Sequence, residues 1–317
     1  MDTIALPAGY VSRAPSLADA DAILDLVSAY NTGIVGFADY TLDDVRHGLT
    51  EPGFDPATDG WLVLDDNGCP VGYGWALGSE DGTLVDVEAL SADPAVAAWL
   101  LDRALVRAAE LGRSRGHDRI TVDRGVYRDD ETARRLSAGR GFTVGTTYHR
   151  MRIDHDGPVA PPEPPPGVTL RDATDETVRR TAYQVMTAAF ADHYGETATS
   201  YADWLALREA RATFDWARLT VLERDGVPVA VCERTDQFVE DENCGYVIKI
   251  GTLPAARGQG LARYLLRRTF AADAAAGRAG TLLHVDTNNT TPALGLYTSV
   301  GMRPVLVIDV WRTELTT

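Results

Sequence analysis

Along residues 168–317, short apolar runs bounded by glycine, proline or charged residues alternate with longer stretches rich in alanine and leucine. Short runs of this kind are typical of strands, and the longer stretches are typical of helices. The pattern predicts strands over residues 168–171, 219–223, 227–235, 245–253, 281–286 and 304–311. It predicts helices over residues 177–191, 201–211, 258–276 and 292–300, the second with Ser200 as its N-cap.

The first half of the chain repeats this pattern. Residues 63–71 (VLDDNGCPV) match residues 221–229 (VLERDGVPV), and each reads as a hairpin with a glycine in its turn. Residues 136–142 match residues 296–302 at a similar distance. We therefore interpret the chain as a tandem duplication of one α/β unit, with a period far longer than that of solenoid repeats.

A proline-rich segment, residues 157–167 (GPVAPPEPPPG), separates the two halves. So many prolines cannot join a helix or a central strand, which predicts an extended, stiff spacer. We predict a first domain over residues 1–156, a linker over residues 157–167 and a second domain over residues 168–317.

The second domain carries a glycine-bearing loop, residues 254–262 (PAARGQGLA), between a predicted strand and a predicted helix. The free N–H groups and the positive dipole end of a helix start can hold a pyrophosphate without a metal. Gly258 and Gly260 would let phosphate oxygens approach, because they have no β-carbon. The segment lacks the Gly-Lys-Ser/Thr of a P-loop and the third glycine of a dinucleotide fold.

Two motifs in this domain resemble the acyl-CoA-binding core of the GNAT N-acyltransferase superfamily. The Arg/Gln-x-x-Gly-x-Gly/Ala signature of that family is read here from Arg257 to Ala262. Its later Asn…Ala-x-x-Leu-Tyr…Gly-Phe/Met signature is read from Asn289 to Met302, with Tyr297 as the tyrosine. The resemblance implies an α/β class (an α+β GNAT fold) with two tandem acyltransferase-like domains, each a mixed central sheet flanked by helices.

The tandem arrangement resembles that of mycothiol synthase and related actinobacterial two-domain GNAT proteins. Nothing in the sequence identifies the mycothiol precursor as the acceptor, so the resemblance carries over the architecture and not the substrate. It implies an N-acetyltransferase that moves an acetyl group from acetyl-CoA to a small-molecule amine by direct attack, with no metal. Two alternatives stay open: an acyl-CoA-binding module without transfer, and an acyl-CoA decarboxylase on the same fold.

The resemblance also implies which residues hold acetyl-CoA, namely one strand edge, the glycine loop and the start of the last helix. The expected cofactor contacts are Ile250, Gly251, Thr252, Arg257, Gly258, Gln259, Gly260, Leu261, Ala262, Arg263 and Asn289. Arg267 and Arg268 are further phosphate candidates. A solvated helix face is the alternative for these arginines, and a helix N-cap is the alternative for Asn289.

Tyr297 is the expected general acid, because a phenol near the sulfur can protonate the departing thiolate; a core aromatic is the alternative. Glu233 is the first candidate for the base, since a partly desolvated carboxylate has a raised pKa. His284 is the second, because imidazole titrates near neutrality. A water chain is a third option for deprotonating the amine.

Acceptor contacts are expected from His193 and from the acidic pair Asp241 and Glu242, which would attract a cationic amine. A solvated acidic loop is the alternative for the pair. Charge reversal of Asp241 and Glu242 is expected to raise the acceptor KM without changing the affinity for acetyl-CoA.

The first domain departs from these motifs at the positions that matter most. Its equivalent loop, residues 90–98, has Ala95 in place of Gly260 and adds Asp93, whose carboxylate would oppose a pyrophosphate. Ser137 stands where the second domain has Tyr297. We predict that the first domain is a degenerate copy whose role is packing and shaping the substrate cleft.

Composition narrows the class of protein further. Of 317 residues, 46 are acidic and 30 are Lys or Arg, and a net charge of −16 argues against sequence-independent nucleic-acid binding. Three widely spaced cysteines form no metal or disulfide pattern, which favours the cytoplasm. The N-terminus does not read as a signal peptide, and no apolar stretch is long enough to span a membrane. The oligomeric state cannot be deduced from the sequence.

Overall fold

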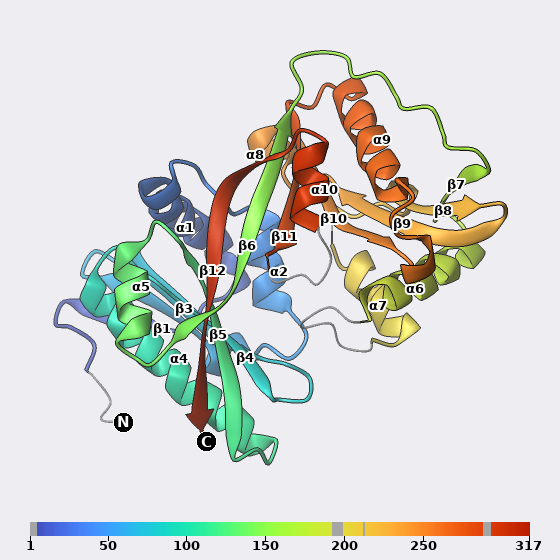
Figure 1. Ribbon diagram of the computed structural model, residues 1–317. Coiled ribbons are helices and arrows are strands. Elements are labelled where there is room, and N and C mark those ends of the chain that lie inside the picture. Colours follow the sequence, from blue (N-terminus) through green and yellow to red (C-terminus); the bar gives the residue numbers. More distant parts are fainter. Residues whose placement is uncertain (1–4, 192–198, 212, 288–292) are drawn as a thin grey trace. The chain divides into compact units, whose positions relative to one another are not determined.

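The structure is a computed structural model that describes residues 5–191, 199–211, 213–287 and 293–317. It divides into an N-terminal unit, residues 1–148 with 306–317, and a C-terminal unit, residues 149–305. The division differs from the predicted domains, because it falls within β6 (Thr143–Asp154) and gives the end of β12 (Arg303–Thr316) to the N-terminal unit. That end of β12 pairs antiparallel with β5 (Arg119–Tyr127), a long-range contact that no local pattern reveals. Residues 158–165 carry neither helix nor strand (Figure 1).

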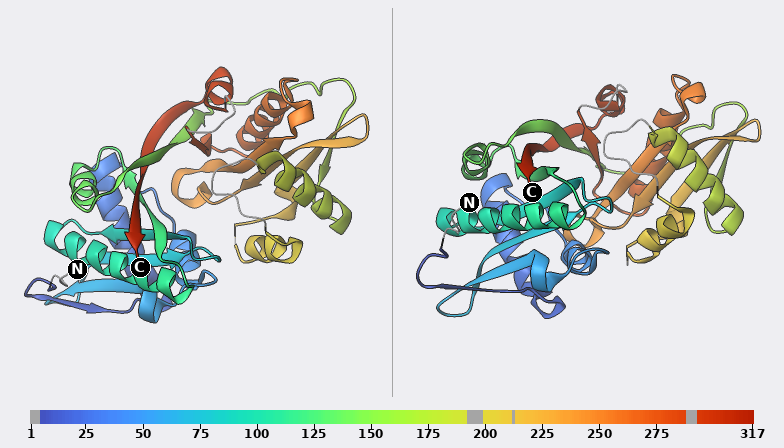
Figure 2. Two further views of the ribbon diagram at one scale, coloured as in Figure 1. Left: turned by 60° about the horizontal axis from the view of Figure 1, so that its bottom comes forward. Right: turned by 90° about the horizontal axis from the view of Figure 1, so that it is seen from below.

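The N-terminal unit contains a sheet in the order β1-β2-β3-β4-β5-β12. Its other elements are β1 (Tyr10–Arg13), α1 (Ala20–Val35), α2 (Leu42–Thr50), α3 (Pro56–Asp59), β2 (Gly60–Asp65), β3 (Pro70–Gly78), β4 (Leu84–Leu90), α4 (Pro94–Ser114) and α5 (Glu131–Ala138). Residues of α4 and α5 pack in one core cluster, and residues of α1 and α2 pack in another. The two helix pairs therefore cover different parts of the sheet, and Figure 2 shows the long helix α4 lying along it.

The C-terminal unit repeats most of this succession of elements and adds a short helix between its third and fourth strands. Its sheet order is β6-β11-β10-β9-β8-β7. Its elements are β7 (Val168–Asp172), α6 (Glu176–Phe190), α7 (Tyr201–Glu209), β8 (Leu219–Arg224), β9 (Val227–Thr235), α8 (Val239–Glu242), β10 (Cys244–Thr252), α9 (Leu261–Ala275), β11 (Gly280–Asp286) and α10 (Ala293–Ser299). The sheet is mixed, because β10 pairs parallel with β11 and antiparallel with β9. In each unit a mixed sheet is thus flanked by helices, as predicted.

Side-chain alternation decides which face of this sheet each strand residue occupies. Cys232 and Val247 pack with α9 residues in one cluster, whereas Val231 packs with α6 and α7 residues in another. Successive strand residues point to opposite faces, so the sheet has an α9 face and an α6/α7 face. Figure 1 shows α9 and α6 on opposite sides of β8 and β9.

Several local predictions are confirmed at the level of single residues. Strand β9 covers the predicted range, and the Ser200 side chain accepts a hydrogen bond from the Asp203 amide at the start of α7. Both predicted hairpins are present, as β2–β3 and β8–β9. Within the described ranges, no helix combines the length and the apolar character needed to cross a membrane.

Candidate active site

The glycine loop meets α9 in a conformation that leaves the helix start open. Gly258 and Gly260 have φ angles of 75° and 77°, which favour glycine, and neither has an atom within 4 Å of the position a β-carbon would take. Gly260 is the N-cap of α9, so the helix begins at Leu261 and three residues later than predicted. No side chain caps this end, and the first turn contains no acidic residue.

The backbone amides of this segment are free to bind a ligand. Among the described residues, Gly258, Gln259 and Gly260 donate no backbone hydrogen bond, and residues 261–263 are the first three amides of α9, which have no acceptor within the helix. These N–H groups lie at the positive end of the helix dipole. Free amides at the positive end of a helix dipole are the chemistry that binds a pyrophosphate.

The side chains of the loop hold it in place. The Arg257 guanidinium donates to the carbonyl oxygens of Thr252 and Ala189, each at 3.2 Å, and so connects the loop to β10 and to the end of α6. Gln259 accepts a hydrogen bond from Arg224, and Arg263 donates to Ser299 Oγ at 3.1 Å. For these three residues the backbone, rather than the side chain, is the part left available to a cofactor.

Strands β10 and β11 separate beside this loop. Their parallel pairing runs from Cys244–Gly280 to Val247–Leu283 and then stops, while β10 continues to Thr252 paired with β9 alone. A bulge between Val247 and Lys249 marks the point of separation. Among the described residues, the edge of residues 248–252 that faces away from β9 therefore has no partner strand, and it can accept an extended, amide-bearing ligand.

The surroundings of Gly251 and Thr252, two residues of this edge, bear on their residue types. A β-carbon on Gly251 would lie 2.7 Å from the Phe190 ring and 2.9 Å from the Ala189 methyl group, so glycine allows α6 to pack closely. The Thr252 Oγ1 atom is buried and has no hydrogen-bond partner among the described residues. A buried hydroxyl without a partner is costly, and a bound ligand would satisfy it.

Tyr297 lies on α10 in the core cluster that also holds Leu261 and Leu265 of α9. Its hydroxyl makes no hydrogen bond to any described residue. Burial, with a smaller contribution from Cys232, raises the pKa of Tyr297 to about 12, so the phenol keeps its proton at neutral pH. A neutral phenol next to the glycine-loop helix is suited to donate a proton.

Comparison with known proteins agrees with this geometry. The acetyltransferase (GNAT) family model matches residues 182–302. A mycothiol acetyltransferase of Frankia alni is 33% identical over 241 residues, which are 73% of this chain and 70% of that protein. Another, of Stackebrandtia nassauensis, is 28% identical over 307 residues, covering 93% and 92%. This chain belongs to the GNAT acetyltransferase family.

Two solved structures share the fold of the whole chain. A GCN5-related N-acetyltransferase from Sphaerobacter thermophilus aligns with a TM-score of 0.83 at 23% identity and covers 99% of this chain and 98% of that one. A tandem GNAT protein from the clavulanic acid biosynthesis pathway aligns with a TM-score of 0.71 at 16% identity, covering 96% and 98%. The family, the tandem fold and the acyltransferase activity expected from the sequence are therefore confirmed, and the family uses acetyl-CoA.

His284 lies at the point where the two strands of this GNAT sheet separate, because it follows the last paired residue of β11, Leu283. Its Nδ1 is 2.9 Å from the hydroxyl of Tyr246, which neighbours it from β10. Burial, and then the charge of Arg150, lowers the pKa of His284 to about 4. The ring is therefore neutral near pH 7. When Nδ1–H donates to Tyr246, Nε2 carries the lone pair and has no hydrogen-bond partner among the described residues.

Glu233, the first candidate for the base, forms a buried ion pair. Its Oε2 lies 2.7 Å from Nη2 of Arg208 on α7, and the two side chains are 3% and 12% exposed. The Arg208 guanidinium also lies 3.9 Å from the centre of the Trp204 ring. The Arg208–Glu233 ion pair therefore connects α7 to β9.

We expect Arg208→Met to lower the free energy of unfolding by about 3 kcal/mol, because it leaves the Glu233 carboxylate buried without its partner. Chemical denaturation followed by tryptophan fluorescence measures the change. Arg135→Met, which removes an exposed ion pair with Glu131, is the matched control, and its effect should stay below about 1 kcal/mol. Equal effects of the two substitutions would contradict a structural role for the Arg208–Glu233 pair.

Tyr297, the expected general acid, and the two base candidates lie on opposite faces of the sheet. Tyr297 packs with Leu283 and Val285 on the α9 face, so His284, between those two residues, points to the other face. Glu233 likewise points away from the α9 face. Tyr297 makes no hydrogen bond to either residue.

Of the predicted acceptor residues, Asp241 and Glu242 lie side by side on α8. Glu242 on α8 binds Arg150 and Arg152, so it holds the protein together and is not free to attract a cation. Asp241 beside it is exposed. The positions of His193 and of the cofactor candidate Asn289 lie outside the described residues.

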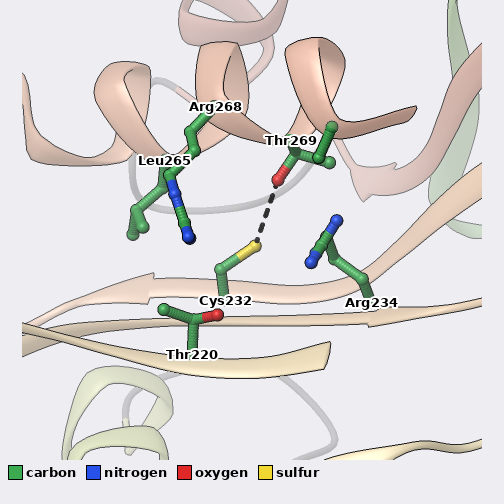
Figure 3. A pocket seen from close by; sticks show the side chains of 7 residues that line it. Thr220, Cys232, Arg234, Leu265, Arg268 and Thr269 are labelled. Atoms are coloured by element: carbon green, nitrogen blue, oxygen red, sulfur yellow. Dashed lines mark hydrogen bonds between the residues drawn. The ribbon is translucent and has the colours of Figure 1, made fainter. Parts of the chain in front are cut away.

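The thiol of Cys232 lies on the α9 face, in the same core cluster as Tyr297. It lies 3.9 Å from Thr269 Oγ1, in a small pocket lined also by Thr220 and Arg268 (Figure 3). Burial raises the pKa of Cys232 to about 11, so the thiol is not a nucleophile at neutral pH.

Sequence reasoning missed Tyr246 and Arg208. The alternation of residues along β10 indicates which face of the sheet Tyr246 occupies. It does not indicate which residue of β11 lies beside Tyr246. The pairing of Arg208 with Glu233 joins a helix to a strand 25 residues away and leaves no local signal.

In the N-terminal unit, the helix start that corresponds to the glycine loop is capped by a side chain. Asp93 caps α4, and its Oδ1 accepts the amides of Ala95 and Val96 at 2.8 and 3.4 Å. Its Oδ2 accepts the hydroxyl of Tyr10 at 2.9 Å. A carboxylate thus accepts hydrogen bonds from the amides that would otherwise be available to a pyrophosphate.

Proposed function

We propose that this acetyltransferase transfers an acetyl group from acetyl-CoA to the amine of a small molecule, and that the C-terminal unit carries the reaction. One observation supports this most strongly: the open glycine loop of α9 lies beside the unpaired edge of β10. The corresponding helix start in the N-terminal unit is capped by Asp93.

The residues of the C-terminal unit divide the work of holding acetyl-CoA. Amides of residues 258–263 bind the pyrophosphate, and residues 250–252 offer backbone groups to the pantetheine arm. Arg257 keeps these two segments at a fixed distance through its bond to the Thr252 carbonyl. Acetyl-CoA supplies the activated acetyl group when it is bound, and fixing the loop and the edge in advance lowers the entropic cost of aligning it.

We assign proton transfer to two residues near the point where β10 and β11 separate, one on each face of the sheet. His284 Nε2 removes the proton from the acceptor amine on the α6/α7 face, with Tyr246 holding the ring through Nδ1. Tyr297 donates its phenol proton to the departing thiolate on the α9 face. Tyr246 acts as a positioning residue, and Glu233 keeps the structural role described above.

The state of His284 can be tested by NMR. We expect the imidazole nitrogen shifts, assigned with His284→Asn, to remain those of a neutral ring from pH 8 to about 5, because burial disfavours the cation. Protonation should occur only near pH 4. A titration midpoint near the ordinary value of about 6.5 would contradict the desolvated environment of the His284 ring.

The names of the relatives suggest where to look for the acceptor. Because proteins named mycothiol acetyltransferase align along most of this chain, we propose mycothiol-related amines as the first acceptors to test. The test is mass-spectrometric detection of the N-acetylated amine together with free CoA. CoA release that requires the amine supports the proposal, no release indicates a binding module, and carbon dioxide without an acceptor indicates a decarboxylase.

A further inference from the structure

The N-terminal unit contains a cavity that the acetyltransferase reaction does not use. Its volume is about 250 Å³, and it is enclosed by α1, β3, β4, β5 and the start of α5. It lies where β4 and β5 separate, since their parallel pairing covers only residues 84–86 and 121–123. A cavity of roughly 150 Å³ already accommodates benzene, so this one has room for a larger organic molecule.

Several polar groups in the cavity have no partner within the described part of the protein. The Asn31 side chain is 2% exposed and lines the cavity, and its amide makes no hydrogen bond to any described residue. The same holds for the hydroxyl of the buried Tyr73. Nε of Arg124, a residue that is 3% exposed, is likewise a buried donor without an acceptor. Buried polar groups are rarely left unpaired, so this set points to a ligand.

The charges around the cavity favour a cation. The lining has three carboxylates, from Asp39, Glu88 and Asp130, and one guanidinium, from Arg124. The Asp130 carboxylate accepts hydrogen bonds from the Tyr30 hydroxyl and from the Ala133 amide. Glu88 accepts the Ala89 amide through Oε1 at 2.8 Å, and the same oxygen lies 3.7 Å from Nη2 of Arg124 in an ion pair. Its Oε2 has no hydrogen-bond partner among the described residues and is the oxygen left for a ligand.

Aromatic rings complete the wall around this carboxylate. The side chains of Tyr30, Tyr40, Tyr73, Trp75 and Tyr127 line the same cavity. The faces of aromatic rings attract organic cations, most strongly where water is excluded. A free carboxylate oxygen surrounded by aromatic rings is therefore a site for an ammonium group, and Asn31 and Tyr73 can bond hydroxyl or amide groups on the same molecule.

An acyl-CoA does not fit this position. Asp93 already occupies the helix amides that would hold its pyrophosphate. Between the separated strands, Arg124 donates to the carbonyl of Ala89 at 2.7 Å and to Ser137 Oγ at 3.1 Å, and so fills the edge where a pantetheine arm would bind. The cavity that remains does not reach Asp93, and Ala89 and Arg124 of the filled edge form part of its wall.

We propose that the N-terminal unit binds a small organic amine, as its ammonium cation, in the cavity lined by Asn31, Tyr73, Trp75 and Glu88. The ammonium group lies against the Glu88 carboxylate and the aromatic rings, and polar groups of the ligand bond Asn31 and Tyr73. This site is additional to the acetyl-CoA site of the C-terminal unit and takes a ligand of different chemistry.

Trp75 provides a reporter inside the cavity. The chain has six tryptophans, so 5-fluorotryptophan labelling gives few ¹⁹F signals, and Trp75→Phe assigns the one from the cavity. The probes are ethanolamine, choline and putrescine, each paired with a neutral analogue: ethylene glycol, 3,3-dimethyl-1-butanol and 1,4-butanediol. We expect at least one amine to move the Trp75 signal with saturation below about 10 mM, and its neutral analogue to leave the signal unchanged.

Variants separate this site from general effects of charge. Glu88→Gln should weaken binding roughly tenfold or more, and Tyr73→Phe, which removes a single hydroxyl, about threefold. Asp21→Asn, on the exposed side of α1, should leave binding unchanged. No movement with any amine, equal movement with a neutral analogue, or equal affinity in Glu88→Gln would overturn the proposal. Movement with acetyl-CoA instead would make the cavity an acyl-CoA site. None of these outcomes depends on whether the C-terminal unit catalyses acetyl transfer.

Discussion

Gly260→Glu is expected to weaken acetyl-CoA binding at least 100-fold, which corresponds to about 3 kcal/mol. Two physical effects add in the same direction. The φ angle of 77° is unfavourable for any residue with a β-carbon, so the loop would shift its amides. The new carboxylate would also lie at the helix start, as Asp93 does in the N-terminal unit, and repel the pyrophosphate. Isothermal titration calorimetry with acetyl-CoA measures the loss.

Gly277→Glu is the matched control for this substitution. Gly277 follows the other end of the same helix, has a φ angle of 74°, and likewise has no atom within 4 Å of the place where a β-carbon would lie. The control therefore carries similar backbone strain and the same charge change away from the loop. Acetyl-CoA affinity in Gly277→Glu should stay within about threefold of wild type. Equal losses in the two variants would show that strain, rather than the loop, decides binding.

Tyr297→Phe should lower kcat roughly 100-fold and change the acetyl-CoA dissociation constant by less than about threefold. The substitution keeps the ring in its core cluster and removes only the proton donor. Steady-state kinetics with a saturating amine, together with calorimetry for acetyl-CoA, separate the two effects. Tyr264→Phe, a buried tyrosine of α9 in the same cluster, is the control and should leave kcat almost unchanged.

The pH dependence adds a second readout for Tyr297. Because burial raises its pKa to about 12, the phenol remains protonated and able to donate throughout the range from neutral to mildly alkaline pH. The ratio of wild-type to Tyr297→Phe kcat should therefore be constant between about pH 7 and 10. A ratio that falls toward 1 near the ordinary tyrosine pKa of about 10 would contradict the assignment, as would an unchanged kcat in the variant.

Features encoded locally were predictable from the sequence. Strand β9, the Ser200 N-cap and the glycine loop all follow from short stretches whose residue types have few conformational alternatives. The start of α9 was predicted three residues too early. The reason is that Gly258 and Gly260 adopt positive φ angles, which a helical pattern alone does not reveal.

Features that depend on long-range pairing were not predictable. The C-terminal residues of β12 join the sheet of the N-terminal unit through β5, so the unit boundary could not be read from the proline-rich segment. The contact between Tyr246 and His284, and the ion pair of Glu233 with Arg208, each join segments from different parts of the chain. Such contacts decide which titratable group is free to act, and they require the register of the sheet.

The central claim is that a single acetyl-CoA site exists, at the glycine loop of the C-terminal unit. Native mass spectrometry of the full chain with acetyl-CoA tests it most directly. We predict one bound acetyl-CoA per chain in the wild type and in Gly277→Glu, and none in Gly260→Glu. Two bound molecules in the wild type, or one retained in Gly260→Glu, would contradict the account.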